Sequence, residues 1–383
     1  MNRHRFPGLL DGWARLDGAA GTQPVDSVIE AIDAWLRSGR VANEGGQFAA
    51  AGACDALVAA ARSSVGELLV ADPAGVVFGP SMTALTFAFT RAVARVLRPG
   101  DEIVCTRLDH DANVAPWLAA ARDSGATVRF AEPDPDTLEL PIGAFEKVLG
   151  RRTRWVAVTA ASNAVGTMPD LAAIAALTHE HGSQLFVDAV HAVAHRRLNV
   201  AAVGCDALAC SAYKWFGPHL SVLWARPQLL ARLTPQKLRP ASDGIPERWE
   251  QGTSSFEALA GIVAAADYLH TLDWPRVRAH EQALFAQLLD GLAAIDGVTL
   301  FGHASERAPT VMFTVDGRTS AQVAERLAAE RVAVWDGTYY AWELFRLLGL
   351  TRDGAVRASI VHYNDASDVE RLVDAVAALA DGH

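Results

Sequence analysis

The sequence predicts an α/β fold in which helices cover both faces of a mainly parallel sheet, followed by a smaller α+β domain. Two patterns predict it. From about residue 55 to residue 224, short runs of β-branched and aromatic residues alternate with alanine-rich segments of helical pattern. A polar stretch rich in Gly, Ser and Pro, 239–256, ends this alternation. The length of 383 residues also exceeds what one compact core usually holds.

The strand candidates of the first part are short apolar runs separated by helical segments and turn residues. They are "AGVVFG" (74–79), "DEIVCT" (101–106), "ATVRFA" (126–131), "RWVAVTA" (154–160), "SQLFVDA" (183–189), "CDALACS" (205–211) and "SVLWAR" (221–226). The clearest helical segments between them span 81–97 and 113–125. Because parallel strands need helical crossovers, this order predicts a mainly parallel sheet.

The pattern changes in the last third of the chain. A long helical block, 256–294, precedes the runs "GVTLFG", "PTVMFTV", "RVAVWDG" and "VRASIVHYN", with further helices near 319–330 and 366–381. This order is typical of antiparallel strands packed against two or three helices. We therefore expect a large domain at 17–255 and a small domain that combines 1–16 plus 256–383.

The composition favours small-molecule chemistry. The chain has 51% hydrophobic residues and a formal net charge of −10 at pH 7, with no dense run of Lys and Arg that would mark a nucleic-acid site. No apolar stretch has the length of a membrane span, and the first residues lack one of signal-peptide length. We expect a cytoplasmic protein with no nucleic-acid or membrane partner.

The cysteines predict neither a metal site nor a disulfide framework. Cys54, Cys105, Cys205 and Cys210 show no C-x-x-C pair and no regular spacing. Cys205 and Cys210 lie among alanines and leucines, as buried cysteines that only pack usually do. We expect four free thiols.

Polar side chains follow five of the predicted strands. In open α/β sheets the ligand lies beyond the carboxyl ends of the strands, so these residues are expected to share one edge. They are Gly79–Thr83, Asp109–Asn113, Ser162–Asn163, Asp188 with His191, and Ser211 with Lys214. This edge would hold hydroxyls, an imidazole, an amide, a carboxylate and an amine.

Several common sites are excluded by their missing motifs. The sequence has no G-x-G-x-x-G between a strand and a helix, no G-x-x-x-x-G-K-[ST] and no G-x-S-x-G. His191 and His195, in "HAVAH", have the i, i+4 spacing of zinc ligands, but the glutamate of H-E-x-x-H is absent. We therefore expect no metal site.

Asp188 and Lys214 together point to pyridoxal phosphate (PLP). Lys214 lies in "SAYKWFGPH", among small and aromatic residues where a charged amine is costly unless it is paired or used. The cofactor needs an amine for a Schiff base and an acid that keeps its pyridine nitrogen protonated. The turn "GPSMTALTF" opens a helix whose amides and hydroxyls suit a phosphate. A partly neutral, buried lysine is what this chemistry requires.

The chain resembles class V aminotransferases of PLP fold type I, in their cysteine desulfurase-like branch. The resemblance runs nearly end to end, through "RLDGAAGT", "LDHDANVAPW", "ASNAVGT", "FVDAVHAVAH", "CSAYKWFGPH", "RWEQGTSSFEAL" and "VRASIVHYND". It implies a PLP enzyme that acts on an amino acid and works as a homodimer.

The resemblance also implies roles for the residues around the cofactor ring. Lys214 matches the Schiff-base lysine, and Asp188 matches the partner of the pyridinium nitrogen. His110 matches the imidazole that stacks on the ring. His191 stands where a glutamine usually lies beside the phenolic oxygen, and an imidazole can still hydrogen-bond there.

Further matched residues would hold the phosphate and the substrate. Asn163 and Arg357 match a pair that grips a substrate carboxylate, a task suited to the forked guanidinium. The residues that match phosphate contacts are Ser81, Met82 through its backbone, Ser211 and Tyr213, with Gly252 and Thr253 reaching in from the second subunit.

Two departures from the family pattern concern Tyr213 and the loop before Arg357. Tyr213 puts a phenol where the family's "S-x-H-K" has an imidazole. Cysteine desulfurases carry a nucleophilic cysteine on this loop, but the segment "VAVWDGTYYAWEL" (332–344) has none, and Tyr340 aligns with its place.

The missing cysteine directs the predicted reaction. Without a thiol to capture sulfur, we predict β-elimination from cysteine or an S-substituted cysteine, with the aromatic loop 335–342 against the sulfur substituent. Transamination, epimerisation and decarboxylative oxidation of an amino acid stay open on the same scaffold. A non-catalytic role is disfavoured, because Lys214, Asp188, His110 and Arg357 are all present.

Overall fold

A computed structural model describes residues 2–380 of the chain. Its larger sheet has seven strands in the order β2-β8-β7-β6-β5-β3-β4. The neighbouring strands β4, β3, β5, β6 and β7 are parallel, whereas β8 runs antiparallel to both β7 and β2. The strands are β2 (Val76–Gly79), β3 (Glu102–Thr106), β4 (Thr127–Ala131), β5 (Thr153–Thr159), β6 (Gln184–Asp188), β7 (Ala207–Ser211) and β8 (Ser221–Ala225). Each predicted strand of this part is therefore confirmed.

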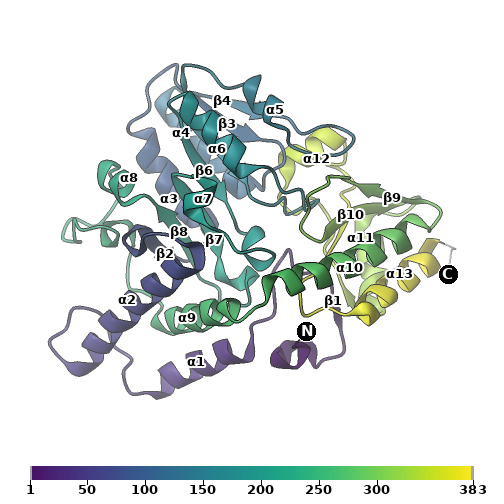
Figure 1. Ribbon diagram of the computed structural model, residues 1–383, viewed down its shortest axis with the longest axis horizontal. Coiled ribbons are helices and arrows are strands. Elements are labelled where there is room, and N and C mark those ends of the chain that lie inside the picture. Colours follow the sequence, from purple (N-terminus) through teal and green to yellow (C-terminus); the bar gives the residue numbers. More distant parts are fainter. Residues whose placement is uncertain (1, 381–383) are drawn as a thin grey trace.

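Helices lie on both faces of this sheet, as Figure 1 shows. The chain's helices are α1 (Asp26–Arg37), α2 (Ala49–Leu69), α3 (Met82–Ala94), α4 (Ala115–Ser124), α5 (Ile142–Glu146), α6 (Leu171–Glu180), α7 (Val200–Val203), α8 (Pro227–Arg232), α9 (Phe256–His270), α10 (Trp274–Ala293), α11 (Ser320–Ala329), α12 (Trp342–Leu348) and α13 (Ala366–Ala380). Short 3-10 turns are η1 (Arg3–Arg5), η2 (Pro7–Leu9), η3 (Pro73–Gly75), η4 (Asp111–Asn113), η5 (Ala192–Ala194), η6 (Ala212–Lys214) and η7 (Glu247–Trp249).

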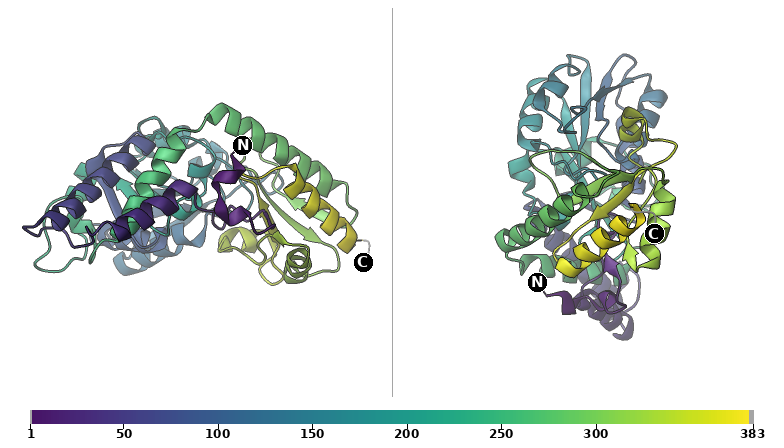
Figure 2. Two further views of the ribbon diagram at one scale, coloured as in Figure 1. Left: turned by 90° about the horizontal axis from the view of Figure 1, so that it is seen from below. Right: turned by 90° about the vertical axis from the view of Figure 1, so that its right-hand side faces the viewer.

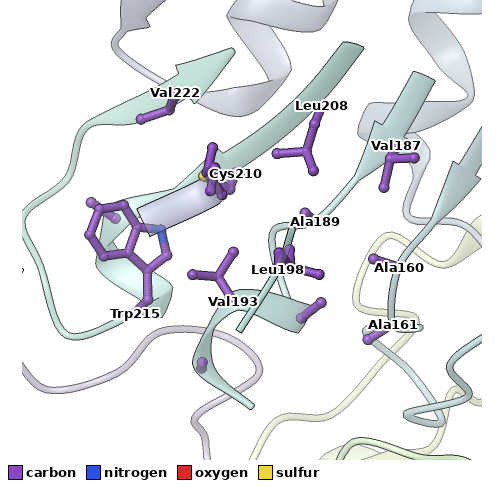
Figure 3. Close-up of a cluster of buried hydrophobic side chains, with 14 of the residues drawn as sticks. Ala160, Ala161, Val187, Ala189, Val193, Leu198, Leu208, Cys210, Trp215 and Val222 are labelled. Carbon is purple, nitrogen blue, oxygen red and sulfur yellow. The ribbon is translucent and has the colours of Figure 1, made fainter. Parts of the chain in front are cut away.

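Alternate residues of the central strands pack on opposite faces of the sheet. Val187 and Leu208 belong to one buried cluster, together with apolar residues of α2, α6 and α9, and Figure 3 shows part of it around Cys210 and Trp215. Their neighbours Phe186 and Ala207 belong to a second cluster, with residues of α3 and α4. Because both faces are covered, these strands consist almost wholly of buried apolar residues, which made them recognisable in the sequence.

The C-terminal third forms a second, smaller sheet. Its antiparallel strands run in the order β12-β10-β9, with β9 at Val298–Phe301, β10 at Thr310–Val315 and β12 at Val356–Ser359. Helices α10 and α13 contact each other, and Figure 2 shows them beside this sheet. Near the N-terminus, β1 (Ala14–Arg15) pairs in parallel with β11 (Val332–Ala333).

The predicted helical block 256–294 is two helices rather than one. Helix α9 ends at His270, and α10 begins at Trp274 with Asp273 as its N-cap and Pro275 in its first turn. Proline has no N–H to donate to the preceding turn, so the helix restarts there. Helix α9 packs against α1 and α2, whereas α10 packs against α13 and β9. The boundary at residue 255 stays a prediction.

None of the helices among residues 2–380 combines the length and the apolar composition needed to cross a lipid bilayer.

Candidate active site

A pocket lies at the carboxyl edge of the larger sheet, where β2, β3, β5, β6 and β7 end. It offers about 460 Å³ of space free of protein atoms, part of it open to solvent. Its lining includes most of the residues predicted from the strand ends: Ser81, Met82, His110, Asn163, Asp188, His191, Ser211, Tyr213 and Lys214. Thr159, Ala161 and Val190 also line it and were not among the residues predicted from the strand ends.

Lys214 is buried at the centre of this pocket. It ends the 3-10 turn that follows β7, and only 8% of its surface is exposed. Burial and, to a smaller extent, the positive charge of Arg357 lower the pKa of its amine to about 7, with Asp188 acting in the opposite direction. A large share of the amine is therefore neutral near pH 7 and able to act as a nucleophile or a base.

Asp188 ends β6 and faces the same pocket. Its Oδ1 accepts a hydrogen bond from the N–H of Val190 at 2.9 Å, which fixes the carboxylate against the turn. Burial raises the pKa of Asp188 to about 6, opposed by this hydrogen bond and by the charge of Lys214. The group is mostly ionised at neutral pH, so it can pair with a cation placed in the pocket.

The depressed pKa of Lys214 predicts how fast the apoprotein captures PLP. Below pH 7 the rate should rise about tenfold per pH unit, because it follows the neutral amine, and it should level off above about pH 8. Stopped-flow absorbance after mixing apoprotein with PLP from pH 5.5 to 10 measures it. A rate that keeps rising up to pH 10 would mean an ordinary, solvated lysine.

His110 presents a neutral ring to the pocket. It caps the turn η4, and its Nδ1 accepts a hydrogen bond from the N–H of Ala112 at 3.0 Å. Burial lowers the pKa of His110 to about 3, and the charges of Lys214 and Arg357 add to this effect. Because Nδ1 is an acceptor, the neutral ring carries its proton on Nε2.

The start of α3 and the end of β7 supply groups suited to a phosphate. Ser81 is the N-cap of α3, so its hydroxyl and the free N–H groups of the first turn lie at the positive end of a helix of 13 residues. The hydroxyl of Ser211 is 2.8 Å from that of Ser221, either of which can be the donor. This end of the pocket therefore suits an anion.

Arg357 is a buried cation beside the pocket, with 3% of its surface exposed. Its Nη1 donates to the backbone oxygen of Asn163 at 2.9 Å, and its guanidinium lies 4.6 Å from the ring centre of Tyr339. Among residues 2–380 no carboxylate lies within salt-bridge distance of it. The Oδ1 of Asn163 is also buried without a hydrogen-bond partner. The guanidinium of Arg357 therefore suits the carboxylate of an amino acid, whereas the Oδ1 of Asn163 can accept a hydrogen bond from a donor of a bound molecule.

The aromatic segment 335–342 is fixed against these residues. Trp335 and Arg357 exchange backbone hydrogen bonds of 3.1 and 2.7 Å. The side chain of Asn163 donates to the backbone oxygen of Tyr339 at 2.9 Å, and the N–H of Asp111 donates to that of Tyr340 at 2.7 Å. The sequence predicted Tyr339 only as part of the aromatic loop 335–342, and its contacts with Asn163 and Arg357 carry no local signal.

Tyr340 lies at the mouth of the site. Its ring centre is 5.4 Å from that of His110, and 71% of its surface is exposed. Tyr339 and Tyr340 have φ values of 42° and 58°, a left-handed backbone that is costly for bulky residues. Such strain is kept where surrounding contacts enforce it, often at functional sites.

Two of the predicted residues lie elsewhere in the chain. Gly252 and Thr253 are exposed and line a second hollow beside Phe78 and His219, not the pocket of Lys214. Their predicted contact with a phosphate was across a dimer, which this single chain does not test. Tyr213 lines the main pocket, and its ring stacks on His219 at 4.9 Å.

The four cysteines are free thiols, as predicted, and all are buried. Burial raises the pKa of Cys205 and of Cys210 to about 12 and that of Cys105 well above its usual value. A thiol needs an exposed, positive environment to act as a nucleophile. No cysteine therefore takes the place that Tyr340 has beside His110.

The donor set of this pocket fits PLP. It provides a partly neutral amine, a buried carboxylate, a flat neutral imidazole and an anion site at a helix end. The unpartnered Oδ1 of Asn163 shows that the site is built to be completed by another molecule.

Comparisons with known proteins agree with this assignment. Residues 14–372 match the sequence profile of the family Aminotransferase class-V. A probable cysteine desulfurase of Pseudomonas aeruginosa is 33% identical over 94% of this chain and 92% of its own length. The aminotransferase-like protein FGM3 of Gibberella zeae is 31% identical over 98% of this chain and 96% of its own.

A solved structure shows the same fold. The cysteine desulfurase CsdA of Escherichia coli aligns with a TM-score of 0.90 and 28% identity, over 99% of this chain and 97% of its own. The predicted fold type, the predicted PLP cofactor and the predicted likeness to the cysteine desulfurase branch are thus confirmed. The chain belongs to the class V aminotransferase family and is a PLP-dependent enzyme.

Proposed function

We propose that the protein is a C–S lyase that eliminates a thiol from an S-substituted cysteine. The observation that carries this proposal is the aromatic, cysteine-free segment 335–342 fixed at the mouth of an otherwise complete amino-acid site. Its relatives named cysteine desulfurases support action on a sulfur-containing amino acid.

The residues of the pocket would hold the cofactor as follows. Bound PLP supplies an electron sink that stabilises negative charge at the α-carbon of an amino acid. Lys214 would anchor it covalently, Asp188 would pair with its ring nitrogen, and the ring of His110 would lie against its face. His191 would face its phenolic oxygen, and the phosphate would be held by Ser81, the backbone of Met82, Ser211 and Tyr213.

The substrate would be held by its carboxylate. Arg357 and Asn163 lie together, and Arg357 has no acidic partner within salt-bridge distance among the described residues, so a carboxylate there gains a charge-assisted pair. The amine of Lys214 would serve as the base for the α-proton of a substrate held in this way. Because burial keeps much of this amine neutral, its Nζ can accept the α-proton at neutral pH.

Elimination breaks the bond between the β-carbon and sulfur, and the sulfur leaves with the electron pair and a proton. Overall, an S-substituted cysteine and one water give a thiol, pyruvate and ammonium. No residue is oxidised or reduced. Persulfide formation would instead need a thiolate at the mouth of the site, where Tyr340 lies and no cysteine is within reach.

A homodimer completes this proposal. Gly252 and Thr253 are exposed and lie outside the pocket of their own chain, as expected of residues that reach the phosphate of a second subunit. We also propose that the enzyme is cytoplasmic and that its partners are the amino-acid substrate and a second copy of the chain, with no nucleic acid or membrane.

Product analysis tests the reaction. The holoenzyme is incubated with S-methylcysteine, S-benzylcysteine, cysteine and, as a control without a leaving group, alanine. We expect pyruvate and ammonium from the S-substituted substrates and neither from alanine. A keto acid that retains the sulfur substituent would overturn elimination.

Tyr340→Ala tests the role of the aromatic segment. Loss of an aromatic contact should lower kcat/KM for S-benzylcysteine about fivefold, whereas kcat/KM for S-methylcysteine should hardly change. The small substrate is the control, because the same protein sample is used for both. An equal loss for both substrates would place Tyr340 in the chemistry rather than in substrate choice.

Transamination is the second candidate, because one close relative is described as aminotransferase-like. It would leave the cofactor in its amine form after one turnover and release a keto acid with the substrate's side chain intact. The same product analysis separates it from elimination.

A further inference from the structure

The motif "HAVAH" puts two buried histidines on one turn with different surroundings. His191 and His195 flank η5, which follows β6. Their rings meet edge to face, with centres 4.9 Å apart and planes at 76°. His191 lines the pocket of Lys214, whereas His195 lines a separate cavity on the other side. The ring of His195 therefore supports that of His191 from behind.

Both histidines are held by side chains of the C-terminal third. The Nε2 of His191 is 2.8 Å from the hydroxyl of Thr310 in β10, so Nδ1 is the ring nitrogen left for the pocket. The Nδ1 of His195 is 3.0 Å from the Oε2 of Glu281 in α10. All four side chains are buried. The orientation of His191 thus depends on residues far away in the sequence.

The cavity beside His195 gives its ring room to turn. It offers about 410 Å³ of space free of protein atoms, part of it open to solvent, and is lined by Met168, His195, Arg196, Arg278, Glu281, Gln282, Glu306, Arg307 and Pro309. The Nε2 of His195 and the Oε1 of Glu281 are buried without partners. A polar space of this size holds a few waters that can satisfy both atoms. The bond to Glu281 is therefore what keeps His195 against His191.

The charged groups that act on His191 are positive, whereas His195 has the carboxylate of Glu281 beside it. Burial lowers the pKa of His191 well below its usual value, and the positive charges of His195, Lys214 and Arg357 lower it further. Burial raises the pKa of Glu281, and His195 and His280 oppose that shift. The carboxylate of Glu281 bonds to His195 in the separate cavity and not to His191 in the main pocket. The ring of His191 therefore stays neutral.

We propose that Glu281 and His195 are positioning residues for His191: the Glu281 carboxylate fixes the ring of His195, whose edge-to-face contact holds the Nδ1 of His191 toward the cofactor pocket. The inference rests on the proposed place of His191 beside the cofactor. Through these contacts, helix α10 would influence the surroundings of the cofactor.

The test compares three variants of the full-length protein. Glu281→Ala removes the hydrogen-bond acceptor, Glu281→Gln keeps an oxygen at the same distance, and Gln282→Ala is a matched control in the same helix and at the same cavity. The measurements are the PLP dissociation constant, the wavelength of the bound cofactor's visible band, and the ring ¹⁵N chemical shifts of the apoprotein's histidines.

We expect Glu281→Ala to weaken PLP binding about tenfold, to shift the visible band and to give His191 a mixture of ring tautomers in the apoprotein. Glu281→Gln should restore all three, and Gln282→Ala should match the wild type. A folded Glu281→Ala protein with PLP affinity within twofold of the wild type and an unchanged band would overturn the proposal, even if its thermal stability fell. If Glu281→Ala does not fold, Glu281→Asp, which is one methylene too short to reach His195, takes its place with the same expected shifts.

His191→Ala separates this inference from the cofactor site on which it rests. If His191→Ala leaves PLP affinity and the visible band unchanged, the proposed place of His191 is wrong. If His191→Ala changes both and Glu281→Ala changes neither, the cofactor site stands and only the positioning role of Glu281 and His195 is overturned.

Discussion

Lys214→Ala should abolish the covalent attachment of PLP and lower turnover by at least about 100-fold. The amine of Lys214 is buried, partly neutral and close to the carboxylate of Asp188. We therefore predict that Lys214 binds the cofactor and accepts the α-proton. Purified wild-type protein should be yellow with bound PLP, and the variant should lack the visible band.

Reduction with borohydride followed by peptide mapping checks this assignment. The sequence contains only three lysines, Lys147, Lys214 and Lys237, so the peptide that gains the mass of reduced PLP is unambiguous. Lys147→Ala is the matched control, because Lys147 is exposed and does not line the pocket. Labelling of Lys147 or Lys237, or a visible band that survives in Lys214→Ala, would refute the site.

Asp188→Asn should lower turnover by about 10²- to 10³-fold while the protein still folds. The substitution leaves no negative charge to pair with a cation in a buried pocket, and breaking a buried pair is costly. It should also lower the pKa of Lys214 below about 7, because Asp188 is what opposes burial and Arg357 there. The pH at which the rate of PLP capture levels off should therefore fall.

Asp206→Asn is the matched control for Asp188→Asn. Asp206 is also a buried carboxylate next to a sheet strand, but it bonds to His179 and to the N–H of Leu185 rather than to the pocket. It should change thermal stability and leave the pH dependence of PLP capture unchanged. If both variants move that pH dependence equally, the effect is not specific to Asp188.

The central strands were predictable from the sequence because they are buried on both faces. Runs such as "RWVAVTA" and "SQLFVDA" contain few residues that would suit a surface, and their ends mark one edge of the sheet. The rule that ligands bind at this edge therefore identified Asp188, His110 and Lys214 without any knowledge of distances.

Contacts between distant segments were not predictable. Asn163 meets the backbone of Tyr339, 176 positions away, and His195 meets Glu281, 86 positions away. No local sequence pattern predicts such pairs. Taken alone, Asn163, Tyr339 and His195 are ordinary loop residues, and Glu281 is an ordinary helix residue. The break between α9 and α10 had a local signal in Pro275, which the apolar pattern on either side obscured.

The resemblance to class V aminotransferases predicted roles that neither the sequence pattern nor the geometry of a single chain indicates. Gly252 and Thr253 are exposed and lie outside the pocket, so their predicted contact with the phosphate of a second subunit rests on the resemblance alone. Conversely, the structure adds to the resemblance at Tyr340. Its backbone is fixed through Asp111 and its ring lies beside His110, so the residue predicted to align with the family's cysteine lies at the mouth of the pocket.

The proposed elimination is tested most directly by following the substrate's sulfur. The holoenzyme is given S-benzylcysteine, and the released thiol, the pyruvate and the intact mass of the protein are measured in one reaction. Elimination should give thiol and pyruvate in equal amounts and leave the protein mass unchanged. Alanine as product together with a protein heavier by one benzylthio group, or a keto acid that retains the benzylthio group, would contradict it.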